Sequence, residues 1–224
     1  MKTLWKEHPV LVVLAAVGVV AIGWIAAQKL STYFSDAPSI SARPILKEAK
    51  VRRVVNGHYV KLENDEKLVY AGIRSPFEHE PMFAEAKKRN EAIVVDKTVK
   101  LEYDEDERDS DGRLLGYAFL GDGSLVNVTL VREGLVFVRL TPRAKRYADA
   151  LLAAQAEARL SKRGIWASMT DSNESLYIAD TKYAEFHRPS CEQSKGITGS
   201  RRVELPKKTD FFEKGFAPCP KCKP

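Results

Sequence analysis

The longest apolar stretch lies near the start of the chain. Pro9–Ala27 contains no charged side chain and almost no polar one. A helix of that length spans roughly 28 Å at about 1.5 Å per residue, which is close to the thickness of one hydrocarbon core. Trp5 and Trp24 lie near its two ends, where indole rings prefer the membrane interface. The pattern predicts a single transmembrane anchor within residues 1–30.

The flanks of this stretch predict its orientation. Lys2 and Lys6 precede it and Lys29 follows it, which indicates a cytoplasmic N-terminus with the bulk of the chain in the periplasm or outside the cell. The alternative is a cleaved signal peptide, because Ala21–Gly23 is a small-x-small site. Residues 31–46 are rich in Ser, Ala and Pro and predict a short linker.

The hydrophobic period changes between residues 47 and 167. Short alternating runs, typical of strands, are interrupted by three segments with helical spacing. The order predicts an α+β domain built on an OB-type Greek-key β-barrel of about five strands with about three helices. Strands are expected at Val51–Val55, Tyr59–Leu62, Lys67–Ile73, Thr98–Tyr103, Leu114–Leu120 and Leu135–Leu140, and helices after Pro81, at Val126–Arg132 and at Tyr147–Leu160.

Composition and charge restrict the class of protein. Hydrophobic residues make up 44% of the 224 residues, which is ordinary for a globular chain and excludes a collagen-like, disordered or disulfide-dense protein. The 36 basic and 30 acidic residues give a net charge of +6. This charge allows nucleic-acid binding without indicating it. The acidic run Glu102–Asp109 is interpreted as a solvated loop.

Four motifs in this segment occur in a fixed order. They are VVNGHYV at Val54–Val60, LVYAGIRSP at Leu68–Pro76, DSDGRLLGY at Asp109–Tyr117, and LVNVTLVREGL followed by a helix and Gly164–Trp166. In this order they resemble the staphylococcal nuclease-like (thermonuclease) family, over about residues 47–167. The resemblance implies a nuclease fold, in which active members use Ca²⁺ to cleave phosphodiesters.

The resemblance also locates the positions at which the family carries its catalytic groups. Two metal-binding aspartates, one arginine and the glutamate are replaced here, and the second arginine is kept. The replaced positions are His58, Arg74, Val69 and Phe77, and the retained arginine is Arg113.

These replacements predict loss of nuclease activity. Arg74 brings a positive charge to the cation position, and His58 is a poor ligand for Ca²⁺, which prefers oxygen. A shift of one residue would offer Glu78 as a base but would not restore the metal site. Arg113 is either a remnant phosphate ligand or an ion-pair partner of a nearby carboxylate. Calcium is therefore not expected as a cofactor.

The tail, residues 176–224, carries a metal-binding pattern. His187-x₃-Cys191 and Cys219-x₂-Cys222 contain all three cysteines of the chain. Two such pairs suit one tetrahedral structural zinc ion, and a segment of about 50 residues needs such support. The motif resembles the zinc module of Ada-type DNA-repair methyltransferases. The alternative is a Cys219–Cys222 disulfide with Cys191 free.

These features predict a membrane-anchored, catalytically inactive nuclease-like protein that serves as a binding or scaffold subunit. A protein partner in a membrane complex is the first expectation. The alternatives are a nucleic-acid-binding protein located outside the cytoplasm and a metal-dependent phosphodiesterase. Nucleic-acid binding would use aromatic and cationic side chains near the former active site. The candidates are Tyr59, Tyr70, Phe77, Arg74 and Arg113.

Overall fold

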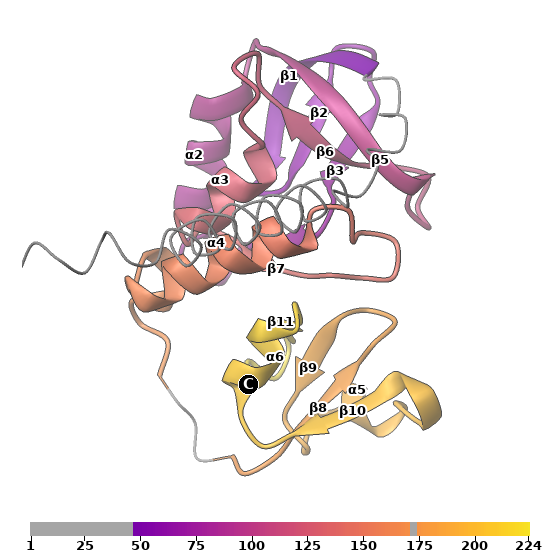
Figure 1. Cartoon of the computed structure of the whole chain (residues 1–224), viewed down its shortest axis with the longest axis vertical. Coiled ribbons are helices and arrows are strands. Elements are labelled where there is room, and N and C mark those ends of the chain that lie inside the picture. Colours follow the sequence, from indigo (N-terminus) through magenta and orange to yellow (C-terminus); the bar gives the residue numbers. More distant parts are fainter. Residues whose placement is uncertain (1–46, 171–173) are drawn as a thin grey trace, which may run out of the picture. The chain divides into compact units, whose positions relative to one another are not determined.

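The computed structural model describes residues 47–170 and 174–224 (Figure 1). The segment Pro44–Pro224 forms one compact unit. The predicted anchor in residues 1–30 and linker in residues 31–46 lie outside the described residues. Within the described ranges, no helix combines the length and the apolar character that crossing a membrane requires.

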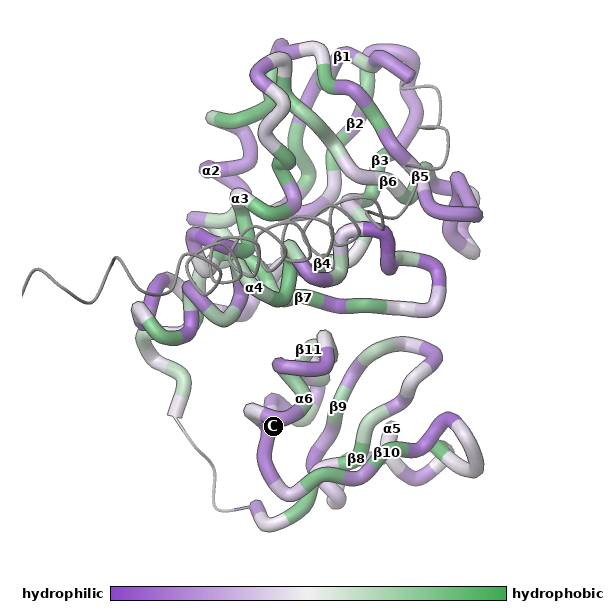
Figure 2. Tube along the Cα trace, in the orientation of Figure 1, coloured by the Kyte–Doolittle hydropathy of each residue, from purple (hydrophilic) through white to green (hydrophobic). Residues whose placement is uncertain are grey.

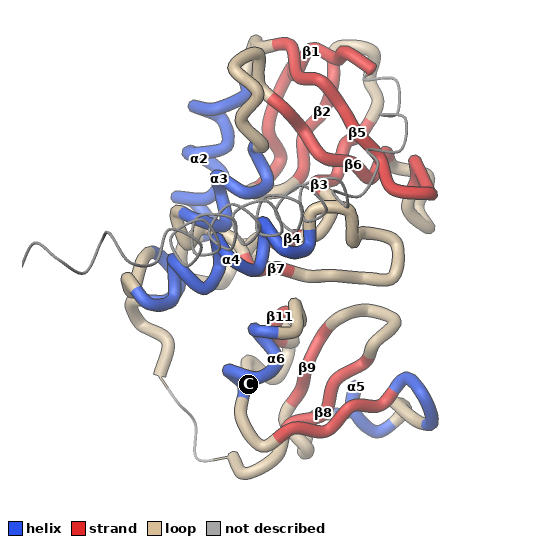
Figure 3. Tube along the Cα trace, viewed as in Figure 1, coloured by secondary structure: helices blue, strands red, loops and turns tan. Residues whose placement is uncertain are grey.

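A closed barrel of five strands forms the first half of the described chain (Figure 3). The strands follow the order β1-β2-β3-β6-β5, and only β3 and β6 run parallel. Buried residues alternate with more exposed ones along β2 and β3, and the buried ones belong to the core. The prediction of an α+β fold with an OB-type barrel is confirmed at this level. The strands are β1 (Lys47–Asn56), β2 (Tyr59–Leu62), β3 (Lys67–Tyr70), β5 (Thr98–Arg108) and β6 (Leu114–Phe119).

The turn between β1 and β2 is set by a glycine. The Asn56 side chain accepts a hydrogen bond of 3.0 Å from the backbone N–H of His58, which closes the turn. A Cβ at Gly57 would lie 2.8 Å from the Ala86 Cβ and 2.9 Å from the Ser75 Cβ. Glycine therefore lets the helix α2 (Phe83–Val94) approach the turn closely.

Three helices pack beside the barrel. Figure 1 shows α2 next to α3 (Val126–Arg132), and α4 (Ala148–Leu160) packs against α3. Their apolar faces join the barrel core, as the hydrophobic spacing predicts. A short 3₁₀ turn, Gly164–Trp166, ends this part of the chain.

Two predicted strands are shorter than expected. The run Lys67–Ile73 divides into β3 and β4 (Ile73–Arg74), because Gly72 adopts a left-handed φ of 76° and turns the chain. Of Leu135–Leu140, only β7 (Phe137–Val138) is a strand, and it pairs with β4 rather than with the barrel. The side chains around this small sheet form the floor of the cleft described below.

The interpretation of Glu102–Asp109 as a loop is wrong. β5 continues through Arg108, which pairs with Leu114 across a tight turn. Figure 2 shows this end of β5 as hydrophilic. Glu102 is buried and accepts a hydrogen bond from the hydroxyl of Tyr147, whereas residues 105–108 are exposed although they belong to the strand.

The C-terminal segment forms a second sheet, in the order β10-β8-β9-β11. Its aromatic side chains share one buried cluster with side chains of the preceding domain, including Phe137 and Trp166. The Gln155 side chain of α4 bridges the two parts, since it accepts from the Val138 N–H and donates to the Phe212 carbonyl, both at 2.8 Å. The elements are β8 (Tyr177–Asp180), β9 (Glu185–His187), α5 (Glu192–Lys195), a 3₁₀ turn (Gly199–Arg201), β10 (Arg202–Leu205), α6 (Lys208–Glu213) and β11 (Ala217–Pro218).

Candidate ligand-binding cleft and metal centre

A cleft of about 690 Å³ opens beside β2, β3 and the β4–β7 sheet. All five positions that the family resemblance identified line this cleft, although they come from four separate segments of the chain. Both tyrosines predicted to bind nucleic acid line it as well, but the prediction for Tyr70 is wrong as a stacking surface, because its ring is buried and its hydroxyl donates to Asn90 at 3.1 Å. The predicted residues that the structure brings together are His58, Tyr59, Val69, Tyr70, Arg74, Phe77 and Arg113.

Arg74 is only 1% exposed, and neighbouring groups hold its guanidinium. One nitrogen donates to the Pro218 carbonyl at 2.9 Å, and another lies 3.4 Å from Glu80 Oε2. The guanidinium also lies 5.1 Å from the ring centres of both Phe77 and Phe137. Burial lowers its pKa from the ordinary value, and Glu80 opposes that shift. The position that the resemblance assigns to a metal-binding carboxylate thus holds an internally bonded cation.

His58 presents a proton donor instead of a metal ligand. Its Nδ1 lies 3.2 Å from the backbone N of Ser75, which donates to it, and 2.8 Å from the Ser75 hydroxyl. A ring nitrogen that accepts from an N–H carries no proton, so Nε2 carries it. Burial, followed by the charges of Arg74 and other arginines, lowers the pKa of His58 to about 3. The ring is therefore neutral near pH 7. Its Nδ1 lone pair, the one that could bind a metal ion, already accepts the Ser75 N–H.

The remaining replaced positions supply neither a phosphate ligand nor a base. Val69 pairs with Tyr59 and Leu115 within the barrel and is apolar. Phe77 is half exposed, and its backbone N–H donates to Glu80 Oε2 at 2.7 Å. Glu78 is exposed. The Glu80 carboxylate, which contacts this position, is occupied by Arg74 and the Phe77 backbone.

Arg113, the retained arginine, is held by two carboxylates. It contacts Asp109 at 2.7 Å and Asp111 at 2.8 Å. The Asp109 side chain also accepts the Arg113 backbone N–H at 3.0 Å, which fixes the turn. Arg113 thus forms the ion pair that one of the two interpretations predicts. A phosphate group that enters the cleft must compete with these aspartates.

The cleft also contains cations and an aromatic ring that the sequence did not single out. Arg139, Arg143, Lys182 and Tyr183 line it together with the predicted residues. Arg139 lies 3.7 Å from Glu185, and Arg143 lies 3.2 Å from Asp106. The basic run from Arg139 to Arg146 is a signal that could have identified the first two. Nothing local identifies Lys182 and Tyr183, which belong to the C-terminal segment.

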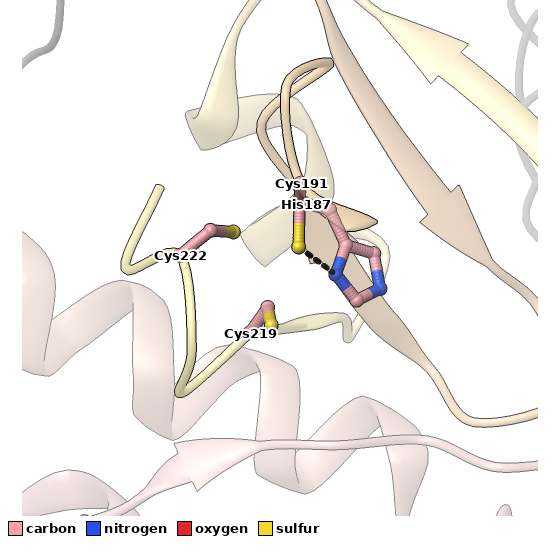
Figure 4. Close-up of side chains that lie close together, drawn as sticks. All are labelled: His187, Cys191, Cys219 and Cys222. Atoms are coloured by element: carbon pink, nitrogen blue, oxygen red, sulfur yellow. Dashed lines mark hydrogen bonds between the residues drawn. The ribbon is translucent and has the colours of Figure 1, made fainter. Parts of the chain in front are cut away.

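The predicted metal ligands converge in the C-terminal segment (Figure 4). His187 ends β9, Cys191 precedes α5, and Cys219 and Cys222 follow β11. The ligand atoms of all four lie within 4.8 Å of one another. The three thiols form no disulfide, so the alternative Cys219–Cys222 bridge is absent from the structure.

The geometry of this cluster fits a tetrahedral ion. Cys191 Sγ lies 3.7 Å from His187 Nδ1. Metal–sulfur and metal–nitrogen bonds of about 2.3 and 2.0 Å give a ligand–ligand edge of about 3.6 Å. The Arg188 N–H points at Cys222 Sγ at 3.4 Å. A hydrogen bond from Cys222 holds the pKa of the Cys219 thiol well below its usual range. Four ligands that include a stabilised thiolate can hold one soft divalent cation such as zinc.

Comparison with known proteins supports the barrel assignment. Residues 67–168 match the family described as Staphylococcal nuclease homologue. The thermonuclease of Staphylococcus intermedius is 30% identical over 125 residues, which are 52% of this chain and 74% of that protein. The thermonuclease of Staphylococcus hyicus is 30% identical over 128 residues, covering 53% and 75%. Endonuclease YncB of Bacillus subtilis (strain 168) is 39% identical over 90 residues, covering 39% and 42%. The chain therefore belongs to the staphylococcal nuclease family.

Proposed function

We propose that this chain is a non-cleaving member of its family, which binds a ligand in the cleft without hydrolysing it. One observation carries the proposal: the position of a metal-binding aspartate holds Arg74, and its guanidinium is bonded to Pro218 and Glu80. The cation that cleavage requires has no carboxylate to bind at this position. His58, at the other position, offers a proton donor.

The electrostatic cost of a cation in this cleft is large. A divalent ion about 4 Å from a guanidinium is repelled by about 8 kcal/mol at an effective dielectric constant of about 20. Oxygen ligands would have to offset this repulsion, because Ca²⁺ binds oxygen. In the cleft, Asp109 is held by Arg113, and the nearby Glu80 is held by Arg74. The chemistry of the cleft therefore suits an anionic ligand better than a metal ion.

Single-stranded nucleic acid is the ligand that we propose. Arg139, Arg143 and Lys182 supply positive charge, and Phe77 and Tyr183 supply exposed rings. Such channels bind phosphates through cations and bases through stacking, largely without regard to sequence. The relatives named thermonuclease and endonuclease fit the same ligand class. Because the arginines are paired with carboxylates, we expect moderate affinity. Binding should weaken as the salt concentration rises, because it depends on phosphate contacts.

Membrane attachment and a structural zinc ion are further parts of the proposal. Residues 1–30 would hold the chain at a membrane, with the cleft outside the cytoplasm. The support for this part is the apolar stretch Pro9–Ala27 and the lysines on either side of it. His187, Cys191, Cys219 and Cys222 would hold the zinc ion and fix the end of β9 to the turn after β11. A scaffold role for a protein partner in a membrane complex is the competing function.

The test uses the full-length chain in a mild nonionic detergent. Single-stranded DNA is incubated with it and millimolar Ca²⁺, and cleavage is followed on a denaturing gel beside an EDTA control. Binding is followed by fluorescence anisotropy. We expect binding and no cleavage. Calcium-dependent cleavage that Arg113→Ala abolishes would overturn the proposal. Absence of binding, with a protein partner co-purifying at fixed stoichiometry, would instead favour the scaffold function.

A further inference from the structure

We propose that the hairpin between β8 and β9 forms one wall of the cleft and that Tyr183 and Lys182 at its tip determine the affinity for single-stranded nucleic acid. This inference rests on the ligand proposed above. It assigns a binding role to a segment that lies outside residues 67–168, the part that matches the family. The cleft would then be composite, with a barrel side and a C-terminal side.

The exposure of aromatic side chains is the first observation. Among the residues described, the large hydrophobic side chains that are most exposed are Phe77, Leu160 and Tyr183. Two of these three, Phe77 and Tyr183, line the same cleft and are each about half exposed. Two exposed rings in one cleft are the arrangement on which the bases of a single strand stack.

The hairpin is fixed against the floor of the cleft. Arg139 directly follows β7, and its Nε donates to the Tyr183 carbonyl at 2.8 Å. The same guanidinium lies 3.7 Å from Glu185 in β9. On the other side of the turn, the Ala184 carbonyl accepts the Ala217 N–H at 2.9 Å. These contacts hold the tip in place, so its two exposed side chains have a defined position.

The tip presents a cation and a ring together. The Lys182 ammonium lies 5.1 Å from the centre of the Tyr183 ring. The Lys182 backbone N–H donates to Asp180 at 2.9 Å, which closes the turn. Lys182 is exposed and makes no ion pair that would neutralise it among the salt bridges of the described residues. A nucleotide bound here would place its base against Tyr183 and its phosphate near Lys182.

The zinc site would support this wall. β9 begins two residues after Tyr183 and ends at His187, one of the four predicted ligands. β11 pairs with β9 in parallel and leads directly to Cys219. Any ion that joins these two strand ends would stabilise the hairpin that carries the wall.

The experiment measures binding of a fluorescein-labelled oligothymidylate to the full-length chain in detergent, at several salt concentrations. We expect Tyr183→Ala to weaken binding by about 5- to 150-fold, the range for loss of one stacked base. Tyr183→Phe should bind like the unmodified chain, because the ring is kept. Lys182→Gln should reduce the slope of log K against log salt by about 0.7, as expected for one lost phosphate contact.

Lys214→Gln is the matched control, because Lys214 is exposed in the same segment and does not line the cleft. It removes the same charge and should leave the slope unchanged. If the unmodified chain binds and both Tyr183→Ala and Lys182→Gln bind equally well, the composite wall is refuted while the ligand stands. If the unmodified chain binds no oligonucleotide at low salt, the ligand itself is refuted, and the inference falls with it. A far-UV circular dichroism spectrum of Tyr183→Ala that matches the unmodified chain shows that weaker binding is not caused by unfolding.

Discussion

Replacing Arg74 tests whether this buried cation now has a structural role. Arg74→Ala removes a charged donor from the Pro218 carbonyl, a contribution of about 1.5–3 kcal/mol. It also removes two ring contacts at 5.1 Å, of which the one to buried Phe137 is worth about 2 kcal/mol and the one to half-exposed Phe77 less. Relief of the cost of burying the guanidinium offsets part of this sum. We therefore expect a loss of about 3–5 kcal/mol in the free energy of unfolding, as for other broken buried ion pairs.

Arg74→Met separates the charge from the packing. Methionine keeps most of the side-chain volume but leaves the Pro218 carbonyl without its donor, so we expect a loss of only about 1–3 kcal/mol. The measurement is urea unfolding of the full-length chain in detergent, followed by far-UV circular dichroism. Arg52→Ala is the control, because Arg52 forms an exposed pair with Asp65 that contributes little. If Arg74→Ala unfolds within about 1 kcal/mol of the control, the contacts of Arg74 are not structural and the reasoning is refuted.

Two further predictions follow from the pH behaviour and the metal cluster. The folded-state pKa of His58 is lowered to about 3, so from about pH 6.5 down to about pH 3 the unfolded chain binds one more proton at this residue than the folded chain. Stability should fall with decreasing pH by about 1.4 kcal/mol per pH unit from this residue. His58→Gln should make the measured slope shallower by that amount, and an unchanged slope would contradict the burial of a neutral ring. Metal analysis of the purified chain should find about one zinc ion per chain, and His187→Ala and Cys222→Ser should each lose the ion and lower the unfolding temperature. A chain that keeps its ion in both variants would show that the predicted ligands are wrong.

The elements of the barrel were predictable because their signals are local. Alternation along Tyr59–Leu62 gives β2 with its bounds, and helical spacing gives α3 at Val126–Arg132. The end of β5 was not predictable in this way. Its charges from Asp104 onward suggest a loop, but pairing of Arg108 with Leu114 keeps the strand extended. Cross-strand pairing, which depends on a second segment, overrides the local charge pattern.

The positions in the cleft were predictable from the family resemblance, but their contacts were not. The resemblance assigns His58, Arg74 and Arg113 to one site, and the structure brings all three to one cleft. The partner of Arg74 is Pro218, 144 residues away. No hydrophobic or polar pattern in either segment indicates that contact. The same holds for the proposed binding role of Tyr183, which depends entirely on where the second sheet packs.

The contact between Arg74 and Pro218 joins the position that the family resemblance assigns to a metal-binding aspartate to the C-terminal segment. A cation site needs unshared oxygen lone pairs, whereas this structure places a donor at Arg74 and directs the Pro218 carbonyl and Glu80 toward it. Arg74→Asp would remove this donor and add a carboxylate, which leaves the oxygen atoms of Pro218 and Glu80 free to bind Ca²⁺, an ion that prefers oxygen ligands. The surroundings of Arg74 have become complementary to a positive charge. Under the proposal that this chain does not cleave, the guanidinium of Arg74 occupies the place of the cation. Because its carbonyl acceptor belongs to the C-terminal segment, the barrel and that segment depend on one another within one compact unit.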